Sequence, residues 1–220
     1  MILSELITEV QALTGREDDT VLINQARVTR FLNEAQNDIV RNCLGHLDLE
    51  TKNATAIAMI ADTYSYDLTS LSPTVLYPLR AFYMDGSASQ VLEYIDTEVF
   101  DNVHPSPDDE ADGIPVEWTR RAATVEVYPV PTAAEAAKYI RMDYTKKPTA
   151  FAVASLTAEC DMSDADQGLL YYAISEAFIA IGNKDQESAS FKQKYLSWLE
   201  DYRQQKDGLY MAECQSILRS

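Results

Sequence analysis

Residues able to do chemistry are few and scattered in this chain of 220 residues. Its two histidines, His46 and His104, lack metal-ligand spacing to each other and to any cysteine. The three cysteines, Cys43, Cys160 and Cys214, form no C-x-x-C pair, which favours free thiols in a reducing compartment. Catalytic triads form across long sequence distances, but no G-x-S-x-G elbow or family-specific cysteine motif occurs here. We therefore expect both histidines to be surface or turn residues.

Cofactor and metal signatures are equally weak. Seven glycines are spread thinly, and neither a G-x-G-x-x-G sequence nor a P-loop occurs. Asp108, Glu110 and Asp112 fit the first, third and fifth places of a calcium loop, but Thr119 occupies the twelfth place, which needs a glutamate. The sequence favours a solvated loop over a calcium site. A hydrolase using a pair of the 35 acidic residues is the weakest hypothesis, since some pair always has suitable spacing. We expect no catalytic, cofactor or metal residues.

The charge balance is the strongest compositional signal. Thirty-five acidic residues face 18 basic ones, a net charge of −17, and such a surface repels phosphate backbones and anionic membranes. No apolar run approaches the roughly 18 residues that span a bilayer. Residues 93–117 contain nine acids and no lysine or arginine. Within them, Asp108, Asp109, Glu110 and Asp112 are predicted to form an acidic surface that faces a channel or solvent. Charge alone favours a solubilising surface.

Helices are predicted at both ends of the chain, because apolar residues recur there in steps of three and four. Gly15 should end the first helix with a left-handed cap, and Asn24 should cap the second. A capping-box-like start at residues 163–166 opens a third helix, in which Glu176 is the only charge from 167 to 183. Such an apolar helix should be buried by neighbours on several sides. The fourth helix should end or kink at Gly208. Its apolar stripe comprises Phe191, Tyr195, Trp198 and Tyr202.

The middle of the chain is predicted to be strands and turns. Alternating patterns indicate strands at 64–68, 76–84, 90–94, 125–128 and 139–144 and near Trp118. Asp85-Gly86 is a hairpin signal, and Pro78 within a strand indicates an edge or a bulge. Residues 97–101 should form a helical turn, and 133–137 a loop.

These elements predict an α+β fold with a helical bundle and an insert. We expect residues 1–46 and 160–212 to form the bundle, because two helical ends flanking a sheet usually pack together. Residues 47–159 should form a β-rich, sandwich-like insert, and residues 213–220 a C-terminal tail.

Several short sequence segments, taken in their order along the chain, resemble the head-to-tail adaptor proteins of tailed bacteriophages. Residues 28–36, VTRFLNEAQ, resemble the family's early helix, and Tyr66-Asp67-Leu68 the strand after it. Residues 115–118 and 125–131 are similar to a proline-x-x-aromatic strand and a strand that ends in a proline pair. Residues 141–148 and 164–178 resemble the next strand and the long apolar helix. Thr69 departs from the pattern, since the family commonly has proline there.

The resemblance implies a structural subunit of the virion neck that catalyses no reaction and assembles in the host cytoplasm. It implies a homo-oligomeric ring, typically of twelve copies, between the portal protein and tail or nozzle proteins, through which DNA passes without specific binding. C-terminal segments of such adaptors reach into portal clefts. By position, Leu209, Tyr210, Ile217, Leu218 and Arg219 are therefore the predicted portal-docking residues. The alternative is an acidic inhibitor that imitates DNA to occupy a nucleic-acid-binding protein, a hypothesis that rests on residues 93–117.

Overall fold

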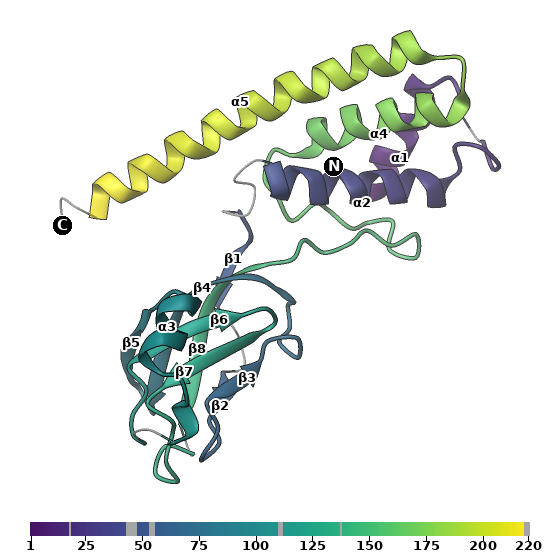
Figure 1. The fold of residues 1–220 in the computed structure, drawn as a ribbon. Coiled ribbons are helices and arrows are strands. Elements are labelled where there is room, and N and C mark those ends of the chain that lie inside the picture. Colours follow the sequence, from purple (N-terminus) through teal and green to yellow (C-terminus); the bar gives the residue numbers. More distant parts are fainter. Residues whose placement is uncertain (18, 43–47, 53–55, 110–111, 137, 218–220) are drawn as a thin grey trace. The chain divides into compact units, whose positions relative to one another are not determined.

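The computed structural model describes the chain except residues 18, 43–47, 53–55, 110–111, 137 and 218–220. The chain divides into two compact units. The helical unit contains Met1–Leu49 and Pro148–Ser220, and the β unit contains Glu50–Lys147. Helices occupy both ends and strands the middle, as Figure 1 shows, so the predicted α+β class is confirmed.

The helical unit is built around one apolar helix. Its helices are α1 (Leu3–Leu13), α2 (Gln25–Asn42), α4 (Asp166–Ile181) and α5 (Asp185–Ile217). α4 packs against α1, α2 and α5, which confirms that this nearly uncharged helix is buried on several sides. Gly168 of α4 lies directly against the indole of Trp198 from α5, and a β-carbon at this position would overlap the ring. α5 and α4 therefore approach closely at a position that only glycine fits.

The helix ends follow local sequence in two of four places. Gly15 has φ +65°, and the amides of Gly15 and Arg16 donate to carbonyls of the last α1 turn, which confirms the left-handed cap. The Asn24 side chain accepts from the Arg27 amide at 2.9 Å, which confirms the second cap. The capping box at 163–166 is wrong, because Ala165 caps α4 without a side-chain bond. Of the end or kink expected at Gly208, the end is wrong, since α5 continues to Ile217.

The β unit is one curled, mixed sheet. Its order is β1-β8-β4-β5-β6-β7-β3, with β2 also paired to β8, and of the pairings between the described strands only β5–β6 is parallel. The hairpin at Asp85-Gly86 joins β4 to β5, and β4 shifts register on either side of Pro78, as predicted. The described strands are β1 (Glu50–Lys52), β2 (Ile57–Ala58), β3 (Ser65–Asp67), β4 (Val75–Asp85), β5 (Ala88–Tyr94), β6 (Glu117–Arg121), β7 (Thr124–Tyr128) and β8 (Tyr139–Lys146).

The two halves of the sheet face each other across a single core. Trp118, Val125 and Val127 from β6 and β7 share this core with Ile140 and Met142 from β8. A short helix, α3 (Thr97–Val103), confirms the helical turn expected at 97–101, and a 3₁₀ turn, η2, follows at Pro107–Asp109. α3 packs against β6, whose core residue Trp118 points the other way, so α3 covers the outer side of that half.

Candidate functional site

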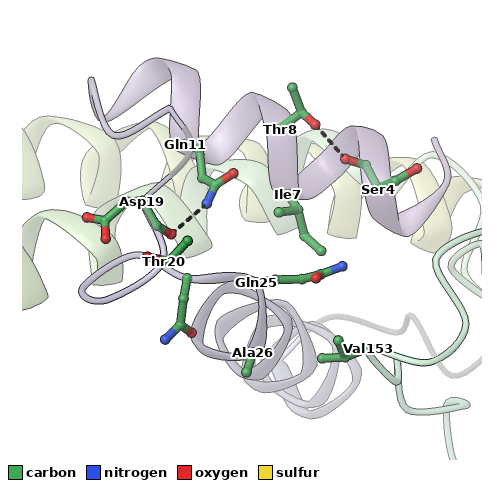
Figure 2. Close-up of a pocket in the computed structure, with 10 residues that line it drawn as sticks. Ser4, Ile7, Thr8, Gln11, Asp19, Thr20, Gln25, Ala26 and Val153 are labelled. Atoms are coloured by element: carbon green, nitrogen blue, oxygen red, sulfur yellow. Dashed lines mark hydrogen bonds between the residues drawn. The ribbon is translucent and has the colours of Figure 1, made fainter.

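One open pocket of about 580 Å³ lies between α1, the start of α2 and the loop that joins them. Figure 2 shows Ser4, Thr8 and Gln11 of α1 along one side. Gln11 donates from Nε2 to the Ile23 carbonyl at 2.7 Å and the Asp19 carbonyl at 3.4 Å. The partly buried side-chain amide of Gln11 therefore holds the α1–α2 loop against α1.

Asp19 is the ionisable residue in this pocket's lining, and its chemistry is structural. Its carboxylate accepts the amides of Val21 and Leu22, each at 2.8 Å. These backbone hydrogen bonds hold the pKa of Asp19 below its ordinary value. A carboxylate so stabilised in its charged form is a poor general base near neutral pH. The Asp19 carboxylate therefore holds the loop between α1 and α2 in place.

A second pocket of about 600 Å³ lies over α4 between α2 and α5. Tyr195 donates from its hydroxyl to Asp38 Oδ2 at 2.6 Å and packs edge-on against Tyr172. Leu196 lines the same pocket and is 47% exposed. The aromatic stripe of α5 thus packs mainly in the core, and Leu196 beside it lines an open groove.

A buried polar cluster, named here the α5 anchor, fixes the middle of α5. It comprises Asp48, Ser163, Tyr202 and Lys206. Lys206 is 4% exposed, and its Nζ lies 2.7 Å from both Asp48 carboxylate oxygens and 2.9 Å from Ser163 Oγ. Tyr202 adds a hydrogen bond to Asp48 Oδ2 at 3.0 Å. The anchor binds α5 to the segments that precede the β unit and α4, and the sequence analysis missed it.

Beyond the anchor, α5 continues for residues 207–217. With 33 residues, α5 is about 50 Å long, whereas its partner α4 has 16 residues and is about 24 Å long. Figure 1 shows the α5 end running on past α4. A β-carbon at Gly208 would meet no atom within 4 Å. The last turns of α5 therefore extend past the helix against which α5 packs.

The predicted docking residues fall on this extension and after it. Leu209, Tyr210 and Ile217 belong to α5, and Leu218 and Arg219 lie outside the described residues. Residues 213–217 of the segment expected to be a tail are helical.

The predicted acidic surface is partly described. Asp108 and Asp112 are exposed, Asp109 belongs to η2, and Glu110 lies outside the described residues. Within the described part of the chain, no group of three or more acidic, histidine or cysteine residues is arranged to hold a metal ion. Exposed carboxylates on a loop give this part of the β unit its charge.

Of the expected surface or turn position for His104, the surface part is wrong. It directly follows α3, but its ring is buried and stacks on Tyr128 with centroids 3.5 Å apart. Its Nε2 lies 3.0 Å from Glu117 Oε2. His104 therefore helps to seat α3 on the sheet. The other predicted surface histidine, His46, lies outside the described residues.

Of the predicted free thiols, only Cys160 has a described side chain. Burial raises the pKa of this thiol to about 11, so it is mostly protonated at neutral pH. Cys43 lies outside the described residues, and the Cys214 side chain is likewise not described.

A family model for the SU10 adaptor protein matches residues 1–214. The chain belongs to this family. The SU10 adaptors are phage head-to-tail adaptors, which confirms the family resemblance and makes the protein a structural component of the virion neck. Adaptors of this kind interact with portal and tail proteins. Comparison with curated proteins gives no match. Across the described helices of this adaptor, none is both long and apolar enough to cross a membrane.

Proposed function

We propose that this adaptor forms a ring of about twelve copies beneath the portal, extends the DNA channel and receives tail or nozzle proteins. The adaptor family supports the role, and the α5 extension is the observation that carries the docking step. Subunits are made in the host cytoplasm and join the virion during assembly. The family match offers no support for the DNA-mimic alternative.

The α5 extension has the form of a docking element. Tyr210, Cys214 and Ile217 follow one another by four and three residues, which is the spacing of one helix face, and Leu209, Met211 and Ala212 add further apolar residues to the extension. Helix formation by residues 207–217 adds about 16 Å of projecting length at 1.5 Å per residue. An amphipathic helix that is held at its base can bury its apolar face in a partner's groove. The anchor at Lys206 supplies that base, so the extension enters a portal cleft with little ordering cost.

The acidic surface suits a channel through which DNA moves. The net charge is −17, and Asp108 and Asp112 are exposed on the β unit. A basic wall would release counterions and bind the phosphate backbone, which would hold the DNA in place. An acidic wall repels the backbone and leaves DNA free to pass. In this proposal the β unit lines the channel with these side chains.

A truncation that ends at Gly208 tests the docking step, because it removes the extension and keeps Lys206. Isolated portal rings would be sedimented with the full chain or with the truncated chain, and bound adaptor would be quantified. We expect the truncated chain to unfold at the same temperature as the full chain and to leave the portal unoccupied. The matched control exchanges the exposed Gln204 and Gln205 for serine in the full chain and should bind normally. Portal occupancy by the truncated chain would reject C-terminal docking.

A size measurement separates the adaptor from the DNA-mimic alternative. Mixed with portal, an adaptor gives a large ring-on-ring complex. An acidic mimic would instead give a small, salt-sensitive complex with a basic protein, as a monomer or dimer.

A further inference from the structure

The β unit has two unlike faces on opposite sides of its core. The outer sides of β4, β5 and β8 form one of them, named here the arginine face. The outer side of α3, which covers β6, forms the other, named here the α3 face. Both halves of the sheet direct their inner side chains into the same core, so their outer sides point away from each other. A unit with this arrangement can contact two neighbours at once.

The arginine face combines exposed apolar groups with guanidinium groups. Val91 and Arg141 lie on either side of Phe82 in the sheet register, and the Arg141 Cζ lies 4.2 Å from the Phe82 ring centroid. Val91 is 62% exposed and Tyr139 47% exposed. Within the β unit, the described helix α3 packs on β6 and not on this face. Exposed aromatic rings and arginines gathered together are typical of the centre of a protein interface.

A polar pair on the arginine face is incompletely satisfied. Arg141 Nε and Asp143 Oδ1 form an ion pair at 3.8 Å, but neither has a hydrogen-bond partner among the described residues, although Asp143 is only 4% exposed. The other oxygen of Asp143 pairs with Arg80 at 3.1 Å. Buried polar atoms are nearly always paired in finished structures. The hydrogen-bonding capacity of these two buried atoms is therefore unfilled among the described residues.

The α3 face has the opposite charge and a matching apolar edge. Val99 and Val103, one helical turn apart, are 50% and 57% exposed. Asp96 and Glu98 lie beside them as exposed carboxylates, and the exposed Asp101 pairs with Arg121. The helix is firmly held, because Thr97 Oγ1 donates to the Arg120 carbonyl at 2.9 Å and Phe100 is buried beneath it. Its exposed valines are thus presented on a fixed surface.

We propose that the α3 face of one adaptor packs on the arginine face of the next copy. Carboxylates then meet guanidinium groups, and Val99 and Val103 cover Phe82 and Val91. The two faces lie on opposite sides of one compact unit. When two copies join, one copy therefore keeps a free arginine face and the other keeps a free α3 face. Such a heterologous contact propagates in one direction and closes into a ring. The inference rests on the proposed ring and identifies the surfaces that hold it together.

Charges introduced at two exposed valines test the contact. Val91→Glu adds an acid to the arginine face, where it meets the carboxylates of α3, and Val99→Lys adds a cation to α3, where it meets arginines. The adaptor concentration that half-saturates portal rings would be measured by sedimentation. We expect each single variant to raise it by about tenfold or more, because like charges at an interface repel. In the double variant, the introduced lysine of one copy meets the introduced glutamate of the next, so at least most of the loss should be recovered.

Two controls keep the outcomes distinct. Val21→Glu introduces the same acid at a valine that is 82% exposed in the helical unit, and it should leave saturation unchanged. Val91→Lys keeps the attraction to α3 and should bind at least as well as the parent. Single variants that saturate like the parent, or a double variant that is weaker than both, would overturn the α3 contact while the ring stands. If the parent itself leaves the portal empty, the proposed function fails instead.

Discussion

The α5 anchor predicts an unequal response when its two charged residues are removed one at a time. In Lys206→Met, the Asp48 carboxylate loses two contacts of 2.7 Å but keeps the Tyr202 hydroxyl at 3.0 Å and the Ser163 amide and hydroxyl, both at 3.1 Å. In Asp48→Ala, the Lys206 ammonium keeps one hydrogen bond from this cluster, to the Ser163 hydroxyl at 2.9 Å, and the face of the Tyr202 ring 5.0 Å away, but no anionic partner. Lys206 is also the more buried partner, with 5% of its side chain exposed against 19% for Asp48.

The magnitudes follow from these remaining contacts. Loss of a charged hydrogen-bonding partner costs about 1.5–3 kcal/mol, which we expect for Lys206→Met. An uncompensated buried charge costs about 3–5 kcal/mol, which we expect for Asp48→Ala. The double variant removes both charges, so it should cost less than the sum of the two.

Urea unfolding in a Trp118→Phe background measures these costs. That substitution leaves Trp198 as the only tryptophan, so fluorescence reports the helical unit alone. Lys192→Met, an exposed lysine on the same helix, is the matched control and should change stability by less than about 0.5 kcal/mol. The account of the anchor is refuted if Asp48→Ala costs no more than Lys206→Met, or if both match the control.

Three further predictions concern single residues. Gly168→Ala should lower stability by about 1–3 kcal/mol in the same assay, because its methyl group displaces Trp198, whereas Gly208→Ala should raise helix content by circular dichroism; equal effects would contradict this. Asp19→Asn should lower the melting temperature at pH 7. The lowered pKa of Asp19 makes its contribution complete above the ordinary value of about 3.9 and lost as the pH falls through the folded-state value, so the two melting temperatures should converge in acid. Cys160, with a pKa of about 11, should react with a disulfide reagent at pH 8 at least a hundredfold more slowly in the folded than in the urea-unfolded chain, and similar rates would refute its burial.

The sequence correctly predicted features that depend on the pattern of one segment or on contacts between residues close in the chain. The apolar surface of α4 continues all round, so several neighbours had to cover it, and α1, α2 and α5 do. Asn24 needed only the Arg27 amide three residues on, and Asp85-Gly86 only its own turn. These are interactions within a few residues of chain.

Tertiary contacts decided the features that sequence missed. Ser163 does not cap α4, because it is engaged by Asp48 and Lys206, which are distant in sequence. One signal for the anchor existed: Lys206 follows Tyr202 by four residues, where the buried stripe of α5 continues, and a cation there requires a carboxylate partner. The strands β1 and β2, of three and two residues, are too short to show a period, and they exist because β8 offers them an edge.

Electron microscopy of portal rings saturated with the adaptor tests the central claim most directly. The account predicts a closed ring of adaptor on each portal, with residues 209–217 of α5 seated in portal clefts. Portals that stay bare, or that carry adaptors attached through another part of the chain, would contradict it.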